Sequence, residues 1–86
     1  MLYTFVTEYL GGTYISQVNA ENSDDALAQS IGPLEKLFNT AIEIATSDKT
    51  SPISGRAGVW CATALNSSEE LILMHIVQTD ENTATG

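Results

Sequence analysis

The sequence predicts a two-layer α+β domain, in which helix covers one face of a four-stranded antiparallel sheet in the order β-β-α-β-β. Three observations lead to this: a glycine pair between two strand-like segments near the N-terminus, an apolar stripe with helical spacing in the middle, and two further strand-like segments near the end. The 86 residues suffice for one core but not for two lobes around a cleft. Residues 1–80 are therefore expected to form a single domain, followed by a frayed polar tail over residues 81–86.

A β-hairpin is expected at the N-terminus, because residues 2–10 and 13–20 are rich in aromatic and β-branched types. The pair Gly11-Gly12 between them readily adopts the positive φ angles of a two-residue turn. Pairing the strands outward from this turn places Tyr9 opposite Tyr14. One face of the hairpin would then be mainly aromatic and the other mainly polar. The aromatic face consists of Tyr3, Phe5, Tyr9 and Tyr14, with Val18.

Helical structure is expected from about residue 24 to 39, with a break near residue 32. Asn22 and Ser23 offer side-chain oxygens for an N-cap, and acidic residues follow in the first turn. An apolar stripe then recurs at spacings of four, three and four residues. Gly32-Pro33 interrupts it, because an internal proline removes a hydrogen bond and clashes with the preceding turn. The stripe consists of Leu27, Ile31, Leu34 and Phe38.

Two assignments follow in the middle of the chain. Residues 40–46 fit a strand through the alternation of Ile42, Glu43 and Ile44, but they also continue the helical stripe, and helix is favoured. Residues 47–58 consist almost entirely of turn-forming types and are predicted to form the longest loop. Long loops in small domains are often functional.

A second hairpin is expected from strands over about 59–65 and 70–79, with a turn over 66–69. The last strand is apolar on both sides, which is typical of a strand covered on both faces. One or two helices in a chain of this length cover only one face of a sheet. A partner subunit is the simplest cover for the other. One side consists of Leu71, Leu73, His75 and Val77, and the other of Ile72, Met74 and Ile76.

Acidic residues dominate the charge: eleven Asp and Glu stand against three Lys and Arg, for a net charge of −8. A nucleic-acid or anionic-membrane binder needs a basic surface, so the composition argues against both functions. A basic protein remains as a partner of opposite charge. The longest apolar stretch, residues 71–77, is too short for a bilayer, and the N-terminus lacks the basic region of a secretory signal. A cytosolic location is therefore expected.

No catalytic, cofactor or metal motif is found. Cys61 and His75 are the only thiol and imidazole of the chain. To act as nucleophile and base they would need to contact each other, and a third group would be needed to complete a triad. Cys61 as a small buried hydrophobe is the favoured interpretation. A zinc site needs three or four ligands. The acids at 21, 24 and 25 lack the spacing of a calcium loop, and Gly11-Gly12 lacks the lysine and helix of a phosphate loop.

The segment Gly-Gly-Thr-Tyr-Ile-Ser-Gln-Val and the later Ser-Asp-Asp-Ala-Leu, both within residues 11–27, resemble the start of HicB-type antitoxin domains. Those domains also have a glycine-turned hairpin followed by an acidic helix start. The Pro-Gly-Cys segment that they usually carry between strand and helix is absent, and their third strand has no counterpart here. The resemblance is therefore local and does not establish membership.

The favoured functional prediction is a non-catalytic interaction module that forms a homodimer through its sheet and needs no cofactor or metal. One alternative is an acidic regulatory inhibitor that binds a basic protein, as antitoxins do. Another is a small-molecule binder or small enzyme that uses Cys61 and His75. The residues predicted to make interactions are Tyr9, Tyr14, Arg56, Trp60, Ile72, Met74 and Ile76.

Overall fold

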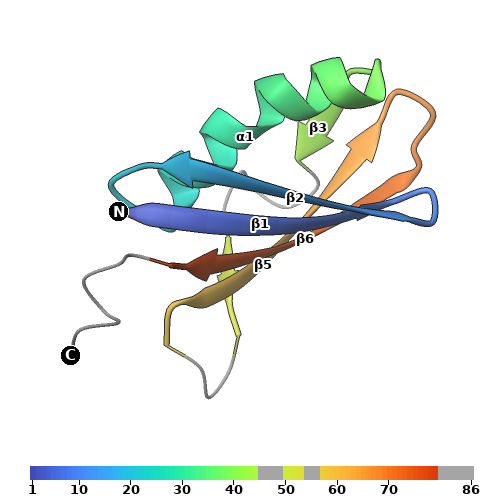
Figure 1. Ribbon diagram of the computed structural model, residues 1–86. Coiled ribbons are helices and arrows are strands. Elements are labelled where there is room, and N and C mark those ends of the chain that lie inside the picture. The colour runs from blue at the N-terminus through green and yellow to red at the C-terminus, as the bar shows by residue number, and fades with distance from the viewer. Residues whose placement is uncertain (45–49, 54–56, 80–86) are drawn as a thin grey trace.

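The computed structural model describes residues 1–44, 50–53 and 57–79. Within these residues it is an α+β fold, with one helix lying along one face of a six-stranded antiparallel sheet (Figure 1). The tail predicted over residues 81–86 lies outside the described residues. The elements are β1 (Leu2–Tyr9), β2 (Gly12–Asn19), α1 (Ser23–Phe38), β3 (Ile42–Ile44), β4 (Ser51–Pro52), β5 (Val59–Asn66) and β6 (Leu71–Gln78).

The sheet has the strand order β2-β1-β6-β5-β3, and β4 also pairs with β5. The two predicted hairpins are therefore joined through β1 and β6, the first and last strands of the chain, which lie side by side in the middle (Figure 1). The backbone N–H of Thr79 donates to the carbonyl of Leu2 at 2.7 Å and continues this ladder. The predicted α+β class is confirmed. The predicted four strands are wrong in number, because β3 and β4 add to the edge of β5.

The first hairpin turns one residue earlier than predicted. Leu10 and Gly11 are the turn residues, with φ angles of 47° and 80°, as a two-residue turn of type I′ requires. Gly12 instead begins β2, opposite Tyr9, and the predicted pairing of Tyr9 with Tyr14 is wrong by two residues. A shift of two keeps every side chain on its predicted face. Gly12 leaves room for an aromatic ring, because a Cβ at this position would lie 2.8 Å from the hydroxyl of Tyr14.

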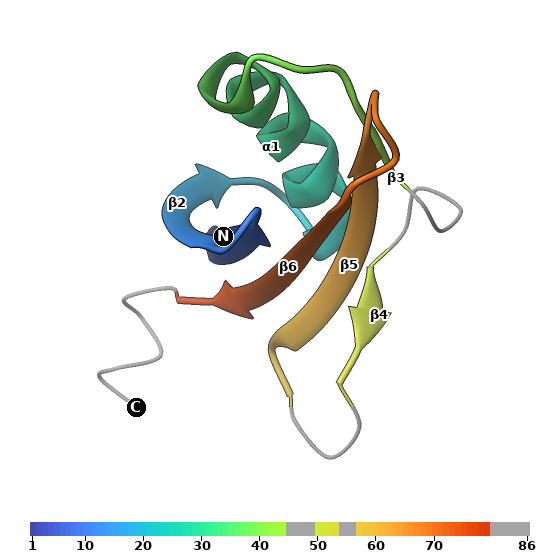
Figure 2. The ribbon, with the colours of Figure 1, turned by 90° about the vertical axis from the view of Figure 1, so that its right-hand side faces the viewer.

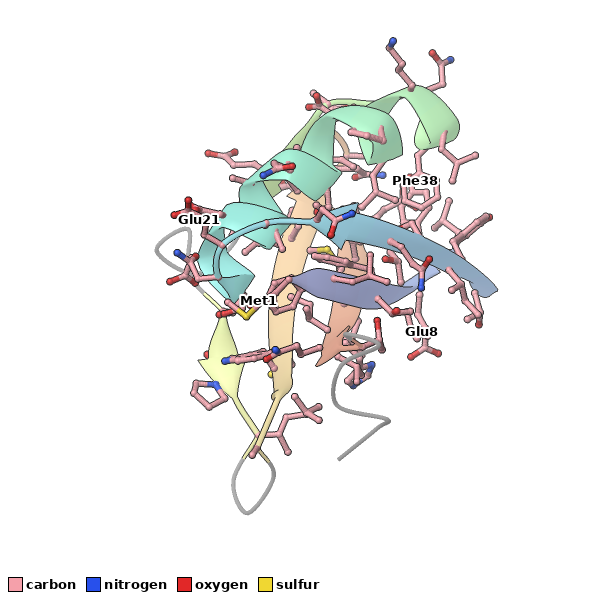
Figure 3. All side chains as sticks on the ribbon, turned by 60° about the vertical axis from the view of Figure 1, so that its left-hand side comes forward. Met1, Glu8, Glu21 and Phe38 are labelled. Atoms are coloured by element: carbon pink, nitrogen blue, oxygen red, sulfur yellow. The ribbon has the colours of Figure 1, made fainter. Side chains whose placement is uncertain are left out.

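The aromatic rings of the hairpin pack on the helix rather than on each other. The ring of Phe38, near the end of α1, lies 4.3 Å from that of Tyr9 and 4.9 Å from that of Tyr14, measured between centroids. Figure 3 shows Phe38 between the helix end and the strands. The ring of Phe38 is therefore consistent with the observed strand register. Both tyrosines contact Phe38 although they are not paired with each other across the strands.

The helix is continuous, so the break predicted near residue 32 is wrong. Asn22 caps its start, where its side-chain oxygen accepts from the N–H of Asp25 at 2.8 Å. Pro33 lies inside the helix and cannot donate to the carbonyl of Gln29. Gln29, Gly32 and Pro33 are all exposed or partly exposed, so water can hydrogen-bond this carbonyl, and the helix tolerates the proline.

The segment after the helix is a strand, where helix is predicted over 40–46. Asn39 adopts the left-handed conformation with φ 53° and ends α1. The carboxylate of Glu35 then accepts from the N–H of Ile42 at 2.8 Å, and Ile42 is buried opposite Asn66. These contacts fix residues 42–44 as β3. Residues 45 and 46 lie outside the described residues.

The loop predicted over 47–58 contains a short strand. Ser51 pairs with Cys61 and Pro52 with Trp60, which makes β4 an addition to the same side of β5 as β3. Residues 47–49 and 54–56 of this loop lie outside the described residues. The connection between β5 and β6 covers residues 67–70, close to the turn predicted over 66–69.

The core fills the space between α1 and the sheet (Figure 3). Each of the long strands β1, β5 and β6 sends alternate side chains into it, and the helix contributes its apolar stripe. The largest side chains with less than 2 % exposure are Tyr3, Phe5, Leu27, Ile72, Met74, Ile76 and Thr7.

Candidate functional site

The second face of the sheet carries no helix or strand within the described chain (Figure 2). We call this surface the open face. It is formed by the side chains of the strands that alternate with the core residues. Its members are Leu2, Thr4, Val6, Glu8, Thr13, Ile15, Gln17, Asn19, Glu43, Ser51, Val59, Cys61, Thr63, Leu65, Leu71, Leu73, His75 and Val77.

Aliphatic residues occupy much of the centre of the open face, whereas the outer strands β2, β3 and β4 add mainly polar ones. A row across four strands runs from Ile15 through Val6 and His75 to Cys61. Leu73 and Val77 flank His75 on β6, and they are only partly buried. Isolated apolar residues on a surface are ordinary, whereas a contiguous exposed apolar patch is typical of protein interfaces and binding grooves.

Charged groups lie at the edge of this face or away from it. Glu8 lies near the end of β1, on the side of the strand away from the helix (Figure 3). Glu43 lies on the edge strand β3, opposite Leu65. Asp24, Asp25 and Lys36 belong to α1, on the opposite side of the sheet. Depletion of charge at the centre of a patch is the compositional signature of the core of a protein interface.

The size of the open face suits an interface. Four strands of eight residues, at about 4.8 Å between strands and about 3.4 Å per residue, give a planar footprint of roughly 500 Å². The accessible area of a surface with protruding side chains exceeds its planar projection. The accessible area of the open face therefore approaches the roughly 800 Å² that a standard interface buries on each partner.

Cys61 and His75 lie directly opposite each other at the centre of the open face. Two backbone hydrogen bonds identify the bonded pairs of this ladder: the N–H of Asn66 donates to the carbonyl of Glu70, and the N–H of Gln78 donates to that of Gly58. Both pairs consist of even-numbered residues. Because bonded and non-bonded pairs alternate along an antiparallel ladder, the odd-numbered pair Cys61 and His75 is a non-hydrogen-bonded one. In such a pair the side chains are closest.

The interaction role predicted for Ile72, Met74 and Ile76 does not fit the fold. All three are 0 % exposed and pack under the helix. The sequence shows two apolar sides of this strand, and the structure shows that the helix covers the even-numbered side. The uncovered side is the alternate one, with Leu73, His75 and Val77.

The remaining predicted residues have different positions. Tyr9 is 8 % exposed, and its hydroxyl accepts from the Asn66 amide at 2.6 Å, so it belongs to the core. Tyr14 is 36 % exposed beside Phe38. Trp60 is partly buried, with its ring centroid 5.7 Å from that of Tyr3 on the helix side of the sheet. Arg56 lies outside the described residues.

Several acids are engaged within the fold. One carboxylate oxygen of Asp24 accepts from both the N–H and the hydroxyl of Thr50, at 2.8 and 2.9 Å. Glu35 accepts from Ile42, and Glu70 accepts from the Asn66 amide at 2.7 Å. These acids serve the structure. The hypothesis of an acidic inhibitor therefore rests on fewer free carboxylates than the composition suggests.

The outer edge of the sheet is a second candidate surface. β2 contains neither charge nor proline, which are the usual protections of an edge strand. Met1 and Ala20 exchange both backbone hydrogen bonds, so by alternation the N–H and C=O groups of Thr13, Ile15 and Gln17 point outward. This edge offers backbone hydrogen bonds but little apolar area.

A shallow hollow of about 820 Å³ lies at the C-terminal end of α1, between Pro33 and Ala41. Its carboxylate, Glu35, is engaged with Ile42. Within the part of the chain that the structure describes, no group of three or more His, Cys, Asp or Glu residues is arranged to hold a metal ion.

Comparison of the chain with protein-family models, curated protein sequences and solved structures finds no match. Among the described residues, α1 is neither long nor apolar enough to cross a bilayer.

Proposed function

We propose that this chain is a non-catalytic interaction module that self-associates by packing the open faces of two copies against each other. The observation that supports this most strongly is β6, the central strand of the sheet. Its even-numbered residues fill the core. Its odd-numbered side presents Leu73 and Val77, which no helix or strand of the described residues covers in one copy.

Face-to-face packing also suits the distribution of charge. The chain carries a net charge of −8, so two copies repel each other, and the arrangement that separates the charges best is favoured. When open faces meet, both α1 helices with Asp24 and Asp25 lie on the outside of the assembly. Two sheets packed in this way lie about 10 Å apart and form a second core between them.

Location and activity complete the proposal. A cytosolic location agrees with the unpaired thiol of Cys61 on the open face, because reducing compartments keep thiols free. A binding role rather than catalysis is proposed because, among the described residues, the strand partners on either side of the Cys61–His75 pair are Val6 and Ser51, and neither is an acid.

Leu73→Glu is expected to abolish self-association and leave the fold intact. Leu73 lies in the middle of the open face and is not part of the helix-side core, so a carboxylate there remains hydrated in one copy but is desolvated in the dimer. The dimer dissociation constant should rise by about a hundredfold or more. Sedimentation velocity at micromolar concentrations, in buffer without chelator, measures the change.

The matched control is Leu37→Glu on α1. Leu37 is 60 % exposed on the helix, on the far side of the sheet from the open face, so the same change there should leave the sedimentation coefficient of the native dimer unaltered. Circular dichroism of both variants verifies the fold. A native chain that sediments as a monomer throughout, or a Leu73→Glu chain that remains dimeric, would contradict the proposed function.

A further inference from the structure

The centre of the open face holds the two side chains of this protein that are the best ligands for zinc. Cys61 is the single cysteine and His75 the single histidine, and they are direct partners across β5 and β6. As a non-hydrogen-bonded pair, their side chains project together from the sheet. Thiolate and imidazole are the preferred protein ligands of zinc.

Neither side chain has a hydrogen-bond partner among the described residues. In one copy, water can satisfy the imidazole. When two open faces pack together, the ring nitrogens of His75 are buried among Val6, Leu73 and Val77, and an unsatisfied polar group there costs free energy. The interface therefore needs a partner for this pair.

We propose that Cys61 and His75 from two copies together bind one zinc ion at the two-fold axis of the dimer. This inference rests on the proposed self-association. One copy supplies two ligands and no third within the described chain, whereas two copies supply the four that a tetrahedral structural site needs. Each thiol releases its proton to solvent on binding. Two thiolates, two imidazoles and Zn²⁺ sum to zero charge, which suits an apolar interface.

The spacing of packed sheets agrees with such a site. A cysteine sulfur lies about 2.8 Å from its Cα and about 2.3 Å from a bound zinc, which places the ion about 5 Å from the sheet. Two sheets packed face to face are about 10 Å apart, so their midplane is also about 5 Å from each. A zinc ion at the midplane is thus within reach of both copies.

Symmetry also brings the two pairs together. β6 is the middle strand of the order β2-β1-β6-β5-β3, and His75 lies near the middle of its eight residues. We place the two-fold axis near this point, in the plane between the two open faces and perpendicular to the strands. With the axis there, the largest area of each copy is buried against the other. Because a two-fold interface pairs each patch with itself, Cys61 and His75 of one copy then face the same pair of the other.

The test is sedimentation velocity of the full chain under reducing conditions, first with EDTA and then with zinc chloride. We expect binding of one zinc per two chains and a dimer that EDTA weakens by about a hundredfold. Cobalt in place of zinc should give the strong visible bands of a tetrahedral site and a thiolate charge-transfer band.

Three variants separate ligation from packing. Cys61→Ser and His75→Gln keep similar volumes and remove a ligand, so each should lose the zinc dependence. Cys61→His replaces one zinc ligand by another and should keep it, with a cobalt spectrum that lacks the charge-transfer band. Circular dichroism shows that each variant is folded, since both positions lie outside the helix-side core.

The outcomes distinguish this inference from the proposed function. A dimer indifferent to zinc and EDTA would overturn the metal site and leave self-association standing. A monomer under every condition would overturn both. Zinc bound by a monomer, or a zinc-induced dimer that survives Cys61→Ser and His75→Gln, would place the metal at other ligands and also overturn the inference.

Discussion

Phe5→Ala is expected to destabilise the fold by about 3–5 kcal/mol, because it removes a large ring from the centre of the core. Phe5 is 0 % exposed in β1, opposite Ser16 on one side and Ile76 on the other. Removing its ring leaves a cavity at the strand that joins the two hairpins. A chain of this length has a total stability of about 4–13 kcal/mol, so the variant loses a large share of it.

Thermal or urea unfolding followed by circular dichroism measures this change, at one protein concentration because association adds to apparent stability. At about 4–8 °C per kcal/mol, the midpoint should fall by about 12 °C or more. Leu37→Ala, at a position 60 % exposed on α1, is the matched control and should change stability by less than about 0.5 kcal/mol. A Phe5→Ala midpoint close to that of the control would show that β1 does not form the centre of the core.

Asn66→Ala is expected to cost about 2–4 kcal/mol, because one side chain makes four hydrogen bonds. Its amide donates to the Tyr9 hydroxyl at 2.6 Å and to Glu70 at 2.7 Å. Its oxygen accepts from the N–H groups of Ser68 and Glu70, at 2.9 and 2.8 Å. Alanine therefore loosens the turn between β5 and β6 and leaves the buried Tyr9 hydroxyl unsatisfied.

Ser68→Ala in the same turn is the control. Ser68 is exposed, and the bond that it contributes to this network is made by its backbone, which alanine retains. The pair of variants thus separates the Asn66 side chain from a general effect of the turn. Equal unfolding midpoints for Asn66→Ala and Ser68→Ala would refute the role assigned to this network.

Much of the fold follows from local patterns. The apolar stripe from Leu27 to Phe38, with its helical period, predicts the helix. Two strand-like segments over 59–65 and 70–79, separated by turn-forming residues, predict the second hairpin. Both signals are local in the chain. The assignments that differ depend on distant contacts, such as Phe38 for the hairpin register and Asn66 for the burial of Ile42.

The candidate site could be predicted only in part. Apolar residues on both sides of the last strand indicate an additional cover, and this prediction leads to the open face. Which side the helix takes depends on the pairing of β1 with β6, a contact between the two ends of the chain. Alternation alone cannot decide this, and for that reason the interaction role predicted for Ile72, Met74 and Ile76 falls on the wrong side of the strand. The pairing of Cys61 with His75 depends on a register that follows from the tight turn before β6.

The most direct test of the proposed self-association is methyl NMR of the native chain on dilution, in buffer without chelator. The proposed dimer predicts concentration-dependent shifts at Val6, Leu73 and Val77 on the open face, with Leu27 and Leu34 of the helix-side core unchanged. Shifts confined to Ile15 would indicate association through the edge of β2 instead. Shifts at Leu37, or no shift at any concentration, would contradict the open face as the site of self-association.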